Sequence, residues 1–155
     1  MGLDMYLNSK RYVSKYFDEA DEQRAETIAE QFPELSKIQG RHSSSPVKEV
    51  TIEAGYWRKA NQIHKWFVDN VQGGTDDCGN YRVAREQLIE LRDLCQKVLD
   101  FRHLATDLLP PSSGFFFGSD KIDDYYWQDL EQTVQILNDA LELPETWDFE
   151  YHSSW

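Results

Sequence analysis

The sequence lacks the features that mark secreted and membrane proteins. It has only two cysteines, Cys78 and Cys95, so we expect no disulfide framework and favour a reducing compartment. No apolar run approaches the roughly 20 residues of a membrane helix. Residues 1–10 also lack the basic and apolar regions of a signal peptide. These absences predict a soluble, cytoplasmic protein that has no membrane partner.

Metal-binding and catalytic motifs are missing as well. The chain contains no CxxC, HxxxH or HExxH spacing, so we expect no metal and no cofactor. A thiol at Cys78 with His64 as its base would be a sensible nucleophilic pair, which leaves a small hydrolase or transferase using His64 as an alternative. Because no local signature accompanies these residues, the sequence favours a protein without catalytic activity over an enzyme.

Basic residues are scarce. The chain has 16 Lys and Arg against 28 Asp and Glu, a net charge of −12, and no Lys or Arg follows Lys121. This excess of negative charge argues against direct binding of nucleic acid, whose phosphates it would repel. The acidic surface can simply confer solubility. It can also mimic nucleic acid, and the chain would then inhibit a basic partner protein.

Hydrophobic periodicity is the strongest structural signal that is present. Spacings of three and four predict helices, alternation predicts strands, and 40% hydrophobic residues are enough for one core. We expect a single α+β domain over residues 1–155, mainly helical, with three to four helices packed on a small antiparallel sheet and a mobile loop near residues 34–46. The expected helices are 18–32, 56–71, 81–107 and 120–142, and the expected strands are 2–7, 47–54 and the tail 147–155.

The expected helix 56–71 carries an island of cations in this acidic chain. Residues three and four apart are neighbours on a helix, so Trp57, Asn61 and His64 would form one line beside Arg58. There Arg58 and Lys59 would hold an anion, Trp57 would stack on a ring and Asn61 would read a polar edge. The turn GGTDDCG follows directly. The predicted ligand-binding residues are therefore Trp57, Arg58, Asn61, His64, Asp77 and Cys78.

Ordinary structural roles remain open for the same residues. The helix 56–71 can be a plain amphipathic helix with a histidine at its boundary. Asp76 or Asp77 can cap the next helix. The segment GFFFGS at 114–119 has three phenylalanines that cannot all point inward, so we expect an aromatic wall or a homo-oligomer contact there, with Ser119 or Asp120 capping the last helix.

Four segments together resemble a known family: MGLDMYL at 1–7, YWRKANQIHKWFVDN at 56–70, DDCG at 76–79 and GFFFGS at 114–119. The family consists of small, uncharacterised proteins encoded by phages and prophages, and it brings no known activity or functional residue. The resemblance implies a phage context, in which proteins of this size often inhibit host machinery or sequester a nucleotide signal.

The residues and the resemblance together predict a phage accessory protein in the cytoplasm of the host cell. It would bind a small host-derived ligand, such as a nucleotide-like anion, without catalysis. An acidic inhibitor of a basic host protein is the alternative.

Overall fold

The computed structural model describes residues 2–38, 45–114 and 118–155. These residues form two compact units: unit 1 comprises Met1–Ser9 and Glu53–Trp155, and unit 2 comprises Lys10–Ile52. The single domain expected over residues 1–155 stays a prediction.

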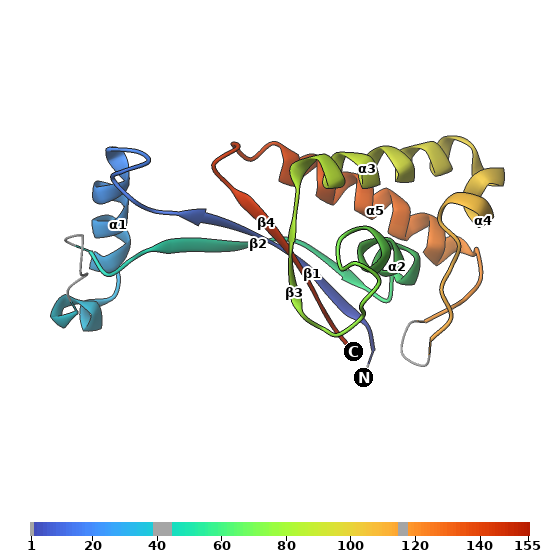
Figure 1. The fold of residues 1–155 in the computed structure, drawn as a ribbon, viewed down its shortest axis with the longest axis horizontal. Helices are drawn as coiled ribbons and strands as arrows, with labels where there is room; N and C mark the ends of the chain where they lie inside the picture. The colour runs from blue at the N-terminus through green and yellow to red at the C-terminus, as the bar shows by residue number, and fades with distance from the viewer. Residues whose placement is uncertain (1, 39–44, 115–117) are drawn as a thin grey trace. The chain divides into compact units, whose positions relative to one another are not determined.

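Unit 1 confirms the expected α+β class. Its antiparallel sheet has the strand order β2-β1-β4-β3, and both chain termini lie close together beside it in Figure 1. The strands are β1 (Asp4–Tyr12), β2 (Glu49–Arg58), β3 (Asn80–Val83) and β4 (Asp148–Ser154). The helices are α2 (Asn61–Asn70), α3 (Arg85–Asp100), α4 (Ala105–Leu108) and α5 (Asp124–Leu141), with a 3-10 turn, η2 (Arg102–Leu104), before α4.

The core lies between one face of this sheet and the helices. Alternate residues of β1 and β4 are buried on that face, as the period of a strand requires. Phe67 of α2 stacks on Tyr151 of β4 with ring centroids 3.9 Å apart. Helices α3 and α5 run side by side (Figure 1). Strand β2 approaches α5 so closely that a Cβ at Gly55 would lie 2.3 Å from Ile136, so only glycine fits there.

The expected helix 56–71 begins too early, and this prediction is corrected. Tyr56 and Trp57 continue β2, because the Trp57 side chain enters the core while the side chains of Tyr56 and Arg58 both reach Asp4 outside it. Aromatic residues suit such a half-buried strand. The chain then turns at Lys59, whose φ is +64°, and α2 starts at Asn61.

The expected helix 81–107 is also wrong at both ends. Residues 80–83 form β3, where Tyr81 pairs with Tyr151 and Val83 with Phe149 of β4. The helix proper, α3, ends at Asp100, and the chain continues through η2 into α4. A short apolar run fits strand and helix spacing equally well, so its partner strand decided the outcome.

Unit 2 contains the far ends of β1 and β2, the helix α1 (Ala20–Glu30) and a 3-10 turn, η1 (Pro33–Lys37). The turn η1 replaces the beginning of the expected mobile loop. Residues 39–44 of that loop, and the phenylalanines 115–117, lie outside the described residues. Among the helices that the structure describes, none is long and apolar enough to cross a membrane.

Candidate functional site

Trp57 does not lie where the sequence analysis expected. Its side chain is fully buried, and its indole Nε1–H donates to Thr133 Oγ1 of α5 at 2.9 Å. The ring also packs near Phe67, with centroids 6.1 Å apart. A ring in this position is core and presents no face to a ligand, so the stacking role expected for Trp57 is corrected.

His64 is likewise buried, and both of its ring nitrogens are engaged. The Tyr151 hydroxyl lies 2.7 Å from Nδ1, and Asp76 Oδ2 lies 3.0 Å from Nε2. Burial raises the pKa of Tyr151 well above its usual value, so its hydroxyl donates to Nδ1, and the Nε2–H donates to Asp76. Trp155 donates to the other Asp76 oxygen at 3.0 Å. This network links α2, β4 and the turn at residue 76, and it leaves His64 no free nitrogen to act as a base.

Asp77 and Cys78 belong to the turn that precedes β3. Asp77 Oδ1 accepts from the Gly79 N–H and from the Tyr81 hydroxyl, both at 2.9 Å. It therefore caps no helix, contrary to the structural alternative that the sequence offered. Cys78 is half-buried with φ at +57°. Since Tyr151 and Asp76 occupy the nitrogens of His64, the alternative pairing of this thiol with His64 as its base is absent from the geometry.

Asn61 organises the junction where β2 meets α2. Its side chain is buried, and its amide Nδ2 donates to the Ser119 carbonyl at 2.8 Å. Its Oδ1 accepts from the Ser112 N–H at 2.9 Å. The start of α2 is thereby tied to both ends of the segment that leads toward α5.

A pocket of about 390 Å³ lies beside this junction. It combines three cations, two carboxylates, two amides and two tyrosines, and its size falls in the usual range for small-ligand sites. The lining residues are Arg58, Lys59, Asn61, Gln62, Gly118, Ser119, Lys121, Asp123, Tyr125, Tyr126 and Asp129. Of the six predicted site residues, the structure brings Arg58 and Asn61 to this pocket and places the other four elsewhere.

The backbone at the pocket is held in an uncommon conformation. Lys59 and Gly118 both have positive φ, +64° and +86°. They meet so closely that a Cβ added at Gly118 would lie 3.2 Å from the Cβ of Lys59. A left-handed lysine costs free energy, and such residues cluster at ligand sites, where the surrounding structure over-determines them.

The three cations of the pocket differ in whether they already form an ion pair. The Arg58 guanidinium donates to Asp4 Oδ1 at 2.8 Å, and the Tyr56 hydroxyl bonds to the same oxygen. Neither Lys59 nor Lys121 forms an ion pair within the described ranges. Two lysines that hold no carboxylate within the described ranges thus line this pocket.

Asp129 is a carboxyl of the pocket whose pKa is changed by its surroundings. Burial raises the pKa of this carboxyl to about 6, and the charge of Asp123 adds to the effect. A hydrogen bond at 3.3 Å from Gln62 Nε2 to Asp129 Oδ2 opposes it. A carboxyl with a raised pKa in a pocket is typical of functional sites.

The first turn of α5 completes the pocket. Asp123 caps the helix by accepting from the N–H groups of Tyr125 and Tyr126 at 3.1 and 3.2 Å. This corrects the expected caps Ser119 and Asp120. Tyr126 is buried and donates to the Leu109 carbonyl at 2.8 Å, whereas the Tyr125 side chain is 74% exposed. Tyr125 therefore offers an open aromatic ring at this pocket.

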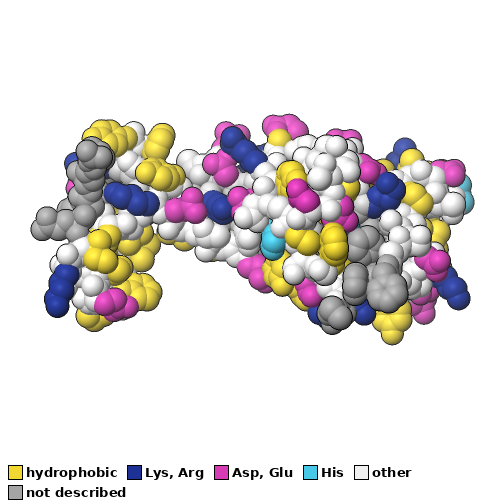
Figure 2. Space-filling model, turned by 60° about the horizontal axis from the view of Figure 1, so that its bottom comes forward, with side chains coloured by type: hydrophobic (Ala, Val, Ile, Leu, Met, Phe, Trp, Pro, Cys, Tyr) yellow, Lys and Arg dark blue, Asp and Glu magenta, His cyan; other side chains and the backbone are white. Residues whose placement is uncertain are grey.

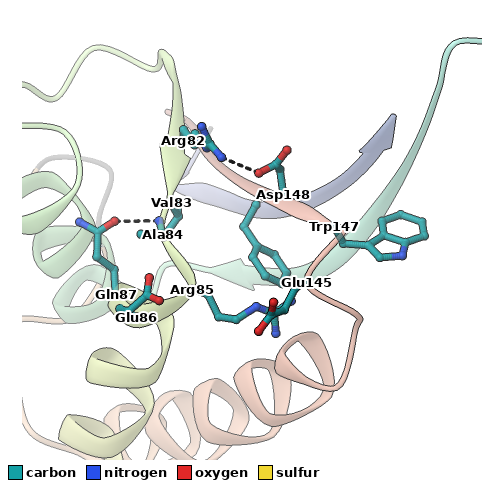
Figure 3. A pocket seen from close by; sticks show the side chains of 10 residues that line it. Arg82, Val83, Ala84, Arg85, Glu86, Gln87, Glu145, Trp147 and Asp148 are labelled. Atoms are coloured by element: carbon teal, nitrogen blue, oxygen red, sulfur yellow. Dashed lines mark hydrogen bonds and ion pairs between the residues drawn. The ribbon is translucent and has the colours of Figure 1, made fainter. Parts of the chain in front are cut away.

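A second pocket, of about 570 Å³, lies where β3 leads into α3 (Figure 3). Both arginines of this pocket already bind carboxylate or carbonyl groups of the protein. Arg82 pairs with Asp148 at 2.7 Å, as the dashed line in Figure 3 marks. Arg85 donates to the carbonyls of Leu141 and Leu143 at 2.9 and 2.8 Å, which fastens the end of α5. Because both arginines serve contacts within the protein, this pocket is better explained by a structural role than as a ligand site.

Sequence reasoning missed Gln62, Lys121, Tyr125 and Asp129. A partial signal existed, because Lys121 is the last cation of the chain and Asp129 lies three residues after Tyr126 on one helical face. These residues come together at the start of α2 through long-range contacts in the folded chain, and the spacing of residues along the sequence does not reveal such contacts.

Comparisons with protein-family models, curated proteins and solved structures find no match for this chain. The phage context consequently remains an expectation that rests on the resemblance alone.

Proposed function

We propose that the protein binds a small anionic ligand, without catalysis, in the pocket at the start of α2. One observation carries the proposal: Lys59 and Lys121, which have no ion pair within the described ranges, line one pocket in a chain of net charge −12. An ammonium group that holds no carboxylate can accept a phosphate or carboxylate of a ligand. Arg58, although paired with Asp4, adds a third positive charge.

The other pocket residues favour a ligand that resembles a nucleotide. The open ring of Tyr125 suits stacking on a planar heterocycle, the role first expected of Trp57. The amide of Gln62 and the carboxyl of Asp129, whose pKa of about 6 allows it to carry a proton, can donate to or accept from such a ring. Cationic residues and an exposed aromatic residue that line the same pocket suit the two ends of a nucleotide.

Ligand-induced thermal stabilisation tests this proposal. The panel contains nucleotides, cyclic nucleotides and inorganic phosphate, and a ligand at 100 times its Kd should stabilise the protein by about 2.7 kcal/mol. Lys59→Asn removes one charge and keeps a residue that tolerates positive φ, and Lys121→Ala removes another. Each variant should weaken binding roughly tenfold, about 1.4 kcal/mol.

Lys65→Ala is the matched control. Lys65 lies on α2, is paired with Asp69 at 2.6 Å and does not line the pocket. Its loss should leave the affinity unchanged. The proposal is refuted if no member of the panel stabilises the wild type, or if Lys65→Ala weakens binding as much as Lys121→Ala does.

The charge of unit 1 favours a second candidate, an acidic inhibitor of a basic host protein. Residues 1–9 and 53–155 hold nine Lys and Arg against twenty Asp and Glu. Such a complex should dissociate steeply as salt rises, because screening weakens contacts between exposed charges. A pull-down from host lysate at low salt tests it. Asp139→Lys on the exposed side of α5 should reduce recovery of the partner, and an unchanged recovery would contradict this candidate.

A further inference from the structure

Unit 2 buries very little apolar surface. Of its described residues, only Val13 and Ala25 are both apolar and buried. Large apolar side chains are instead exposed, and Figure 2 shows hydrophobic groups on the surface of the part that carries α1 in Figure 1. These side chains are Tyr12, Tyr16, Phe17, Phe32, Ile38 and Ile52. Single exposed apolar residues are ordinary, but this many in so short a unit marks an interaction surface.

Three of these rings form one group, which we name the aromatic knob: Tyr12, Tyr16 and Phe17. Their exposed fractions are 54%, 80% and 77%. Tyr12 and Phe17 meet edge to face with centroids 6.1 Å apart. Tyr12 and Phe17 therefore contact each other while all three rings remain exposed, and Tyr16 is the neighbour of Phe17 in the chain.

Hydrogen bonds fix the turn that carries the aromatic knob. The Phe17 N–H donates to the Ser14 carbonyl at 2.9 Å, and the Tyr16 N–H donates to Ser14 Oγ at 3.3 Å. The Ser14 N–H donates in turn to Asp21 Oδ2 at 3.2 Å. The turn is thus anchored to the start of α1.

Asp21 is itself locked in place. Its carboxylate is fully buried and pairs with Arg11 at 2.9 Å and with Arg24 at 2.7 Å. Because Asp21 is buried, an arrangement that left its charge unpaired would be costly, which favours this one arrangement. Rings presented on a fixed turn lose little freedom on binding, which favours association.

The distribution of net charge between the two units favours a second copy of this chain as the partner of the knob. Residues 10–52 hold seven Lys and Arg and eight Asp and Glu, a net charge of −1, whereas the rest of the chain carries −11. Two copies of this chain repel each other through unit 1, and unit 2 is the part where they can meet without a large penalty. The mixed charges around the knob also allow opposite pairs across a two-fold axis.

We propose that the aromatic knob is a self-association surface, on which a second copy of this chain packs its own knob about a two-fold axis. Such a contact is isologous, with the same residues on both sides. The three rings expose about 400 Å² per copy at roughly 200 Å² for each full ring. A standard interface buries about 800 Å² per partner, so the rings supply about half and their surroundings the remainder.

Analytical ultracentrifugation from about 1 to 100 µM tests the proposal against the 18.2 kDa mass of one chain. The wild type should reach twice that mass, and higher salt should strengthen the dimer by screening the acidic parts. The double variant Tyr16→Ser/Phe17→Ser should raise the dimer Kd at least 30-fold, roughly the loss of one hot spot. Phe101→Ser is the control, because Phe101 is 53% exposed in unit 1.

A second measurement does not depend on how the variant folds. Lys15 lies between Tyr12 and Tyr16 of the knob and its side chain is 45% exposed, so an amine-reactive cross-linker should join Lys15 to Lys15 between two wild-type chains. Only an intermolecular link can join a residue to itself, and mass spectrometry identifies it. A monomer at every concentration overturns the proposal, as does a dimer that lacks this cross-link or is weakened by Phe101→Ser but not by the double variant.

Discussion

Replacing Asp129 by asparagine should make the protein more stable at neutral pH. Burial raises the pKa of the Asp129 carboxyl to about 6 in the folded protein, against an ordinary value of 3.8. Between about pH 4 and pH 6 the folded chain therefore keeps a proton that the unfolded chain has released. The stabilisation from Asp129 is greatest below this range, falls as pH rises through it and stays low above it.

The size of the effect follows from the shift. One pKa unit corresponds to 1.36 kcal/mol, so a shift of about two units sets a ceiling near 3 kcal/mol. Asp129 lines an open pocket, and solvent screening reduces the expected value to about 1–2 kcal/mol. Asparagine cannot ionise and can still accept from Gln62. We expect Asp129→Asn to raise the free energy of unfolding by this amount near pH 8 and to change it little near pH 4.

Urea unfolding at several values between about pH 4 and pH 8 measures this difference directly. The control is Asp139→Asn, which removes an exposed carboxyl from the same helix and should leave the pH profile of the wild type unchanged. The reasoning fails if Asp129→Asn unfolds with the same pH dependence as the wild type, because burial would then not disfavour the ionised carboxyl.

Three further outcomes are expected elsewhere in the molecule. Trp57→Phe should lower the free energy of unfolding by about 1–3 kcal/mol, since Thr133 loses its donor in the core; urea unfolding with no loss would contradict this. Asp21→Asn should cost about 1–3 kcal/mol, because the buried group loses its charge-assisted hydrogen bonds while Arg11 and Arg24 keep Asp18; a loss confined to about 0.5 kcal/mol, measured the same way, would show that the cluster is unimportant. Brief iodoacetamide treatment should spare Cys95, whose thiol is buried with its pKa raised to about 12, and label the half-buried Cys78 first; peptide masses that show equal labelling would argue against the buried core.

The parts of the fold that the sequence predicted correctly are those with local signals. Alternation along β1 and a 3.6-residue pattern along α5 each depend on neighbouring residues of one segment. Strand β3 has only four residues, and it exists because Tyr81 pairs with Tyr151 across the sheet. No periodicity within residues 80–83 distinguishes that strand from the first turn of α3, so the helix was expected to begin too early.

The candidate site shows the same limit in its polar residues. Along α2, Asn61 and His64 read as boundary residues beside a ligand, yet each is buried and bonded to another segment: Asn61 to Ser112 and Ser119, and His64 to Tyr151. A buried polar group needs such partners, and spacing cannot name them because they come from distant parts of the chain.

These buried bonds explain why cations gather at the pocket. The amide of Asn61 donates to the Ser119 carbonyl and so holds the segment before α5 at the start of α2. Lys121 follows Ser119 by two residues and is brought to the same place. Lys59 reaches the same place because the chain turns there, with positive φ, between β2 and α2. The anion site that we propose thus uses Lys59 and Lys121, which form no ion pair within the described residues. Asn61, one of the polar residues that first suggested a site, instead forms the hydrogen bonds that bring the segments carrying these two lysines together.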